Sequence, residues 1–393
     1  MPATDYQGSF LGRISIRRNQ VMSMEGNHEQ ELEDLELFQK HVADRFAELA
    51  PPSPSQPSDD IPSDPILSIA WIRKLLDVFL CCDAEFKAIL IMGRDPSQIS
   101  KPPLDRLIPE MLDRDVKALD ICNAITNGIE AVRHYQKLAE IAVSALEQRP
   151  FGDGQVKRAR KALTSLITAM ACEDKDGANY TRTWSFGRRG AAAAGNNKST
   201  GQLRSLSWSV SKNWSAAKQI HAMSANLVAP RGAEASGLAL PVYIMSTILL
   251  FVMWTMVATI PCQERSGLAT HFPVPKQLVW AQSIIGLHEK IAEEWKKKEK
   301  KGSAGLLEEM QKLDKLGQSL IEFTDSFQFP AEDERAEEVS AHLAELGETC
   351  RRMEEGLVPL QVQIREVFHR IVRSRAEFLD VLDLNGKSSA LAM

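Results

Sequence analysis

The sequence lacks most of what marks a secreted or nucleic-acid-binding protein. Its six cysteines are scattered through 393 residues, and no two of them form a CxxC pair. This pattern does not describe a disulfide framework, and it fits a reducing compartment. The first thirty residues contain no apolar core of a signal peptide, so we expect none. The formal net charge of −5 argues against a chain that binds nucleic acid through its overall charge.

Motifs that carry catalysis are also missing. The chain contains no HExxH, GxSxG or P-loop pattern, and its eight histidines do not fall at zinc-binding spacings. The segment Gly152-Asp153-Gly154 precedes a helical pattern but lacks the GK[ST] of a phosphate loop, so a turn that begins a helix explains it better. We therefore predict that the protein is not an enzyme. We expect no catalytic residue, cofactor, metal site or small-molecule substrate.

Strand patterns are absent, and helical patterns replace them along most of the chain. Aromatic residues make up only 6% of the sequence, and no segment alternates apolar and polar residues in the way a strand does. Apolar residues instead recur every three or four positions in the segments 32–49, 66–90, 104–148, 153–170, 214–227, 278–295, 306–327, 336–353 and 360–382. Because these apolar faces are broad, we predict an all-α fold, an elongated antiparallel helical bundle.

Composition divides the chain into five parts. We predict disordered tails at residues 1–28 and 385–393, an N-terminal helical region at 29–174 and a C-terminal helical region at 216–384. Asp64-Pro65 has the pattern of an N-cap followed by proline and predicts a helix start. Between the two helical regions, residues 175–215 are rich in Gly, Ser, Asn and basic side chains. Low hydrophobicity with excess charge predicts a disordered basic linker there.

Two serines of the linker, Ser185 and Ser207, are candidate phosphorylation sites because each follows an arginine by three positions. A phosphate adds nearly two negative charges at neutral pH, roughly −1.5 to −2. It would therefore weaken any contact between this basic segment and an anionic membrane surface. The alternative is an inert linker, and the sequence does not decide between the two.

The most distinctive feature is an uncharged stretch between Glu234 and Glu264, whose centre is the apolar run Val242–Ile260. At 1.5 Å per residue this run would form a helix of roughly 28 Å, close to the thickness of a hydrocarbon core. It is therefore either a membrane span or the buried central helix of a bundle. Basic residues flank it on both sides, so we favour a bundle core or a hairpin-like insertion over a simple span. Its characteristic side chains are Val242, Ile244, Leu249, Leu250, Phe251 and Trp254.

Several segments carry a more specific signal. They are MPATDYQ at the start, WIRKLLD at 71–77 with FLCC at 79–82, APRGAEASGLALPVY at 229–243, and QIREVFHRIV at 363–372. Together they resemble the plant ROH proteins, relatives of the BYPASS family, over essentially the whole chain. The resemblance implies a plant-specific, all-helical protein without catalytic residues.

The resemblance also implies two alternative functions. ROH-type members are associated with the Exo-seventy type of exocyst subunit, which tethers secretory vesicles to the plasma membrane. The first hypothesis is therefore a cytosolic adaptor that binds this subunit and regulates exocytosis and cell-wall or mucilage deposition, with association at the plasma membrane or an endomembrane as an open alternative. BYPASS relatives suggest the alternative, a single-pass membrane protein that restrains a root-derived mobile signal. The acidic helix between Glu332 and Glu348 would suit a basic partner, but an ordinary solvated face explains it better.

Overall fold

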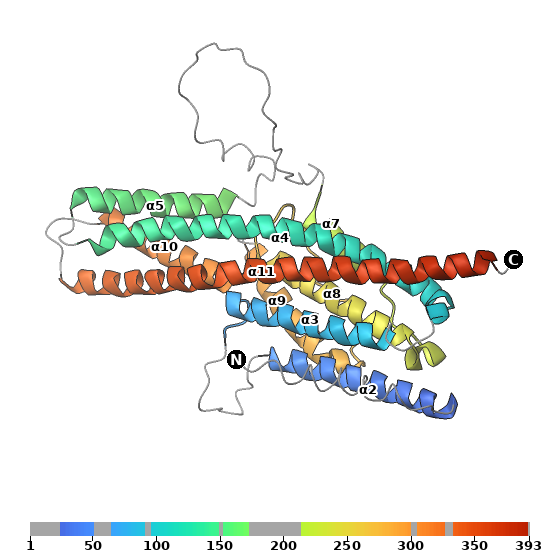
Figure 1. Cartoon of the computed structure of the whole chain (residues 1–393). Helices are drawn as coiled ribbons and strands as arrows, with labels where there is room; N and C mark the ends of the chain where they lie inside the picture. The colour runs from blue at the N-terminus through green and yellow to red at the C-terminus, as the bar shows by residue number, and fades with distance from the viewer. Residues whose placement is uncertain are drawn as a thin grey trace, which may run out of the picture.

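The computed structural model describes residues 24–50, 64–90, 96–148, 152–172, 214–299, 305–326 and 333–391. Within these ranges the chain forms helices and connecting turns and no strand, and the helices pack into an elongated bundle (Figure 1). The predicted all-α class is therefore confirmed. The α-helices are α2 (Met24–Glu48), α3 (Ile69–Leu90), α4 (Leu104–Glu147), α5 (Asp153–Cys172), α7 (Ala216–Ser224), α8 (Ala239–Thr259), α9 (Gln282–Glu299), α10 (Glu308–Ser326) and α11 (Asp333–Leu391). The short 3-10 helices are η2 (Pro96–Ser100), η3 (Gly232–Ser236) and η4 (Val279–Ala281).

The two longest helices, α4 and α11, run antiparallel along the bundle (Figure 1). At one end the thiol of Cys350 lies 4.0 Å from the carbonyl oxygen of Gln136, and at the other end Arg375 donates to the carbonyl of Leu112. With 44 residues, α4 has a length of roughly 66 Å. These two helices set the long dimension of the molecule, and the shorter helices pack along them.

The predicted N-terminal and C-terminal helical regions share one core. Helix α3 lies parallel to α11, because Arg73 donates to Gln363 at 2.8 Å near one end and Ser374 donates to Asp83 at 3.3 Å near the other. Buried apolar side chains from both regions form a single contiguous cluster. The two regions therefore do not fold into separate units in this structure.

Helix ends differ from the predicted ones at both termini of the chain. Helix α2 begins at Met24, inside the predicted tail 1–28, and α11 continues to Leu391, through most of the predicted tail 385–393. These outer turns carry polar and small residues, so no apolar periodicity marks them in the sequence. The predicted linker 175–215 lies outside the described residues, except for its last two positions.

Helix α3 also starts later than predicted, at Ile69 rather than at Asp64-Pro65. Leu67 adopts a left-handed backbone with φ of 65°, which interrupts a helix at that point. The hydroxyl of Ser68 then accepts a hydrogen bond from the N–H of Trp71 at 3.2 Å and caps the first turn. The cap thus lies four residues beyond the one that the sequence indicated.

Helix α8 occupies the centre of the bundle, where α3, α4, α7 and α9 cover it. All 21 of its residues are buried, as expected for a helix that is apolar on every side. Its C-terminal carbonyls on Ala258 and Thr259 accept hydrogen bonds of 3.1 and 3.2 Å from the N–H groups of Leu306 and Leu307. In the described part of the chain, α8 alone is long and apolar enough to cross a bilayer, and protein surrounds it completely.

A single glycine fits α4 against the end of α8. A Cβ atom added at Gly128 would lie 1.8 Å from the carbonyl oxygen of Pro261, far inside contact distance. Backbone atoms at Pro261 cannot move aside in the way that a side chain can. Only glycine therefore allows this close approach in the middle of a long helix.

We predict that Gly128→Ala lowers the free energy of unfolding by ~1 kcal/mol or more, although alanine favours helices. The matched control is Gly286→Ala in α9, where an added Cβ meets nothing within 4 Å. That change is expected to raise the free energy of unfolding by roughly 0.5–1 kcal/mol. Urea denaturation followed by circular dichroism measures both values. Stabilisation of the protein by both substitutions would show that α4 does not press on Pro261.

Candidate functional site

The six apolar side chains singled out in the sequence all lie inside the bundle, each with 3% or less of its surface exposed. Phe251 meets the ring of Phe46 in α2 edge-on, with centroids 5.8 Å apart. The indole N–H of Trp254 donates to the carbonyl of Ala269 at 2.7 Å, and its ring packs 4.1 Å from His288. These residues bind other parts of the same chain, so they build the core rather than a docking site. The candidate phosphorylation sites Ser185 and Ser207 lie outside the described residues.

Two small cavities lie among the described residues of the bundle. One of about 10 Å³ is lined by Leu76, Met253 and other apolar side chains, and one of about 20 Å³ borders Asp115 and Ser246. A volume of roughly 10–15 Å³ holds one water molecule, so neither cavity accommodates a metabolite. No three His, Cys, Asp or Glu side chains among the described residues are grouped to hold a metal ion. The described structure therefore offers no candidate catalytic centre.

Two buried carboxylates, Asp83 and Asp115, link α3, α4 and α11. Asp83 accepts hydrogen bonds from the hydroxyl of Ser374 at 3.3 and 3.4 Å, and Arg370 lies 3.8 Å from it. Burial raises the pKa of Asp83 to about 6, against the opposing effect of Arg370. Burial, together with the negative charge of Asp83, raises the pKa of Asp115 to about 7. Both carboxyl groups therefore titrate close to neutral pH, at a point where helices pack together. The sequence analysis assigned them no role.

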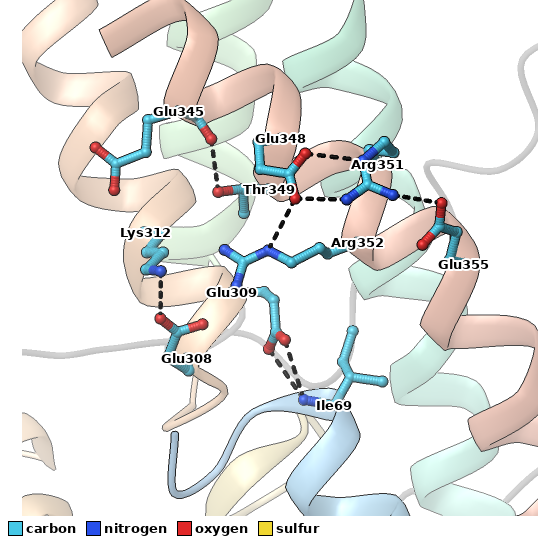
Figure 2. A network of polar contacts seen from close by, with 10 residues as sticks. All are labelled: Ile69, Glu308, Glu309, Lys312, Glu345, Glu348, Thr349, Arg351, Arg352 and Glu355. Carbon is cyan, nitrogen blue, oxygen red and sulfur yellow. Dashed lines mark hydrogen bonds and ion pairs between the residues drawn. The ribbon is translucent and has the colours of Figure 1, made fainter. Parts of the chain in front are cut away.

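A third buried carboxylate joins α10 to the start of α3 (Figure 2). Glu309 accepts hydrogen bonds of 3.1 and 3.2 Å from the N–H of Ile69, a residue 240 positions earlier in the chain. Burial raises the pKa of Glu309 to about 7, while the hydrogen bonds oppose the shift. A carboxylate at this position also complements the positive end of the α3 dipole. These hydrogen bonds therefore fix the start of α3 against α10, although the two helices lie far apart in the sequence.

Arginines of α11 neutralise two acids near residue 350 (Figure 2). Arg351 forms ion pairs with Glu348 and Glu355, each at 2.6 Å, and Arg352 lies 3.9 Å from Glu348. Each of these acids thus has a basic neighbour one turn away on the same helix. At Glu348, the last acid of the predicted acidic segment, this arrangement matches a solvated helix face.

The second half of α11 has a different surface, which the sequence analysis missed. Val358, Val362, Val372 and Leu379 are large apolar residues with 39–56% of their surface exposed. They lie on the side of α11 opposite its buried side chains, such as Leu360, Ile364, Val367 and Ile371. The signal in the sequence is a second apolar line opposite the core line, which is overlooked when all apolar residues of the helix are read as one broad stripe.

The structure therefore defines an all-helical bundle protein. Among its described residues, the buried carboxylates hold helices together inside the bundle, and long helix faces form the surface. The family model "Protein ROH1-like" matches residues 1–382 of the chain. The sequence is 64% identical to Protein ROH1A of Arabidopsis thaliana over 412 aligned positions, which cover 99% of each chain. It is 44% identical to Protein ROH1D of the same plant, over 97% of this chain and 98% of that one.

The chain belongs to the ROH1-like family, and the resemblance seen in the sequence is confirmed. No solved structure matches the fold.

We predict that Leu249→Arg combined with Phe251→Arg unfolds the protein, because both side chains are buried, with 3% and 0% of their surface exposed. An unpaired charge in an apolar core strongly destabilises the folded state. Circular dichroism and the soluble yield of purified protein measure the effect. The matched control is Val279→Arg, at an exposed position beside the bundle, which should leave the fold intact. A folded double variant that has left the membrane fraction would instead identify α8 as a membrane span.

The raised pKa values of Asp83, Asp115 and Glu309 predict that protonation of these carboxylates stabilises the fold. The folded state binds more protons than the unfolded state between the ordinary pKa of an aspartate, 3.8, and the folded value of about 7 for Asp115. The stability that this group contributes is therefore fully present below the lower value and is lost as the pH rises through the upper one. Asp115→Asn should weaken this dependence. Melting temperatures of both proteins measured from pH 5 to pH 8 test it, and parallel curves would contradict the assignment to Asp115.

Proposed function

We propose that this protein is a non-enzymatic adaptor that binds an exocyst subunit of the Exo-seventy type and so modulates polarised secretion and cell-wall or mucilage deposition. The observation that carries the proposal is the contrast between the interior and the surface of the described bundle. The cavity that borders Asp115 and Ser246, about 20 Å³, holds little more than one water molecule. The surface, in contrast, presents helix faces such as that of α11, which extends over 59 residues.

Membership in the ROH1-like family supports the same proposal, because the resemblance to ROH proteins implies an association with this exocyst subunit. A long, preformed helical surface suits the recognition of another elongated helical protein. Such an adaptor needs no cofactor. Its function depends on which surfaces remain exposed when the bundle is folded.

The burial of α8 bears on where the adaptor works. A helix whose 21 residues are all covered by protein has no side left for lipid. This favours a cytosolic protein over the single-pass alternative that would restrain a root-derived signal. Contact with the plasma membrane or endomembranes would then come through the exocyst partner. An additional contact between the basic segment 175–215 and an anionic membrane surface stays a prediction, because that segment lies outside the described residues.

We expect the purified full-length protein to form a stoichiometric complex with a purified exocyst subunit of the Exo-seventy type. Size-exclusion chromatography with light scattering gives the mass of the complex, and titration calorimetry gives its Kd. The Gly128→Ala variant, whose fold is weakened, serves as a control for partial unfolding. Failure of the two folded proteins to associate at micromolar concentrations would overturn the proposed function.

A further inference from the structure

The exposed apolar residues of α11 form one line along the helix. Val358, Arg365, Val372 and Leu379 follow one another at intervals of seven residues, and Val362 falls four residues after the first of them. A seven-residue repeat keeps side chains on one side of a helix and is the spacing with which helices pair. The line spans roughly 32 Å at 1.5 Å per residue. Its length and narrowness fit one further helix.

Charge along this line has one sign. The polar positions between Val358 and Leu379 on the exposed line are Arg365 and His369, and no acid interrupts it. Arg365 and the neighbouring Arg373 have no ion pair within the described residues. The exposed arginine of the acidic half, Arg351, is in contrast paired twice. The second half of α11 therefore offers two arginines that no acid in the described part of the chain neutralises.

A neighbouring helix adds apolar surface at the same level. Arg375 of α11 contacts Leu112 of α4, and the two helices are antiparallel. Val116, one turn after Leu112, therefore lies at about the height of Val372, and 41% of its surface is exposed. The apolar line thus has a companion on α4, and a helix docked on α11 would have a second row of contacts.

The charges on this line distinguish among three partners that could cover it: a second copy of the chain, a membrane surface and a helix of another protein. A second copy offers no acid to Arg365: in a parallel pair Arg365 would face Arg365 of the other copy, and in an antiparallel pair with overlapping lines it would lie opposite Val372 and near His369. A membrane surface prefers a broad apolar face, whereas this line is narrow and has Glu366 and Asp380 on its flank. An amphipathic helix of another protein, with aliphatic residues at the same spacing and an acid opposite Arg365, matches both the narrow apolar line and its positive charge.

We propose that the face of α11 formed by Val358, Val362, Arg365, His369, Val372 and Leu379 is the docking surface for such a helix. The inference rests on the proposed function, since the helix would belong to the exocyst subunit. What is added is the docking surface on α11 and the chemistry of the helix that binds there. The aliphatic residues supply the buried contact area, and Arg365 fixes the register of the partner helix by pairing with its acid.

The test compares the Kd of the purified exocyst subunit for the wild type, the double variant Val362→Glu with Val372→Glu, and the variant Arg365→Glu. All three positions are exposed, so the fold should persist, and circular dichroism with thermal melting checks this. Each variant is expected to weaken binding by roughly tenfold or more, as central interface residues do. The matched control Val228→Glu changes an apolar residue that is 66% exposed elsewhere on the molecule, and it should leave the Kd unchanged.

The possible outcomes separate the two proposals. A wild type that binds and variants that bind equally well would overturn the α11 surface and leave the adaptor function intact. A wild type that does not bind would overturn the adaptor function and, with it, the assigned partner.

A wild-type dimer in sedimentation equilibrium that the double variant loses would identify a second copy as the occupant. Loss of binding to phosphatidylserine vesicles in the variants, without loss of subunit binding, would identify a membrane instead. An acid-to-arginine change in the subunit that restores binding to Arg365→Glu would confirm the register.

Discussion

The structure depends on one constraint, which is that a helix without a polar side must be covered on every side. Helix α8 has no charged residue, and all of its residues are buried. Four α-helices are needed to enclose it, and they come from both ends of the chain. Because α8 takes up the centre, the remaining helices must lie with their apolar faces inward and their polar faces outward. The long surface helices that the proposed adaptor function uses follow from this arrangement.

Much of the fold could be predicted from local patterns. The spacing of apolar residues gave the class and most of the helices, including α4, whose interior Gly128 did not end it. The ends of helices were harder, because the contacts that define them come from elsewhere in the chain. The start of α3 depends on Glu309, a residue in α10, and no pattern near Ile69 announces that contact. The first boundary of the linker and the two serines within it lie beyond the described residues, whereas its other boundary coincides with the start of α7 at Ala216.

The candidate site was less accessible from the sequence than the fold. Asp83 falls on the apolar line that contains Phe79 and Phe86, and Asp115 falls between Met111 and Cys122 in the same way, so both acids could have been marked as buried. Their proximity to each other could not, since it depends on how α3 and α4 pack. The exposed line of α11 was hidden for a related reason. A helix with apolar residues on two lines looks broad in sequence, and only the packing of α4 and α3 shows which line is free.

The covering of α8 has a consequence for how the chain reaches its folded state. Helices α9 to α11 leave the ribosome after α8, and α11 supplies much of the packing on α3 and α4. Contacts between residues hundreds of positions apart form late and slow the search for the native topology. Until α9 has been made, the cover of α8 is incomplete, and a nascent chain exposes part of a segment with the length and composition of a membrane insert. The exposed apolar surface of such an intermediate favours aggregation until the last covering helix is in place.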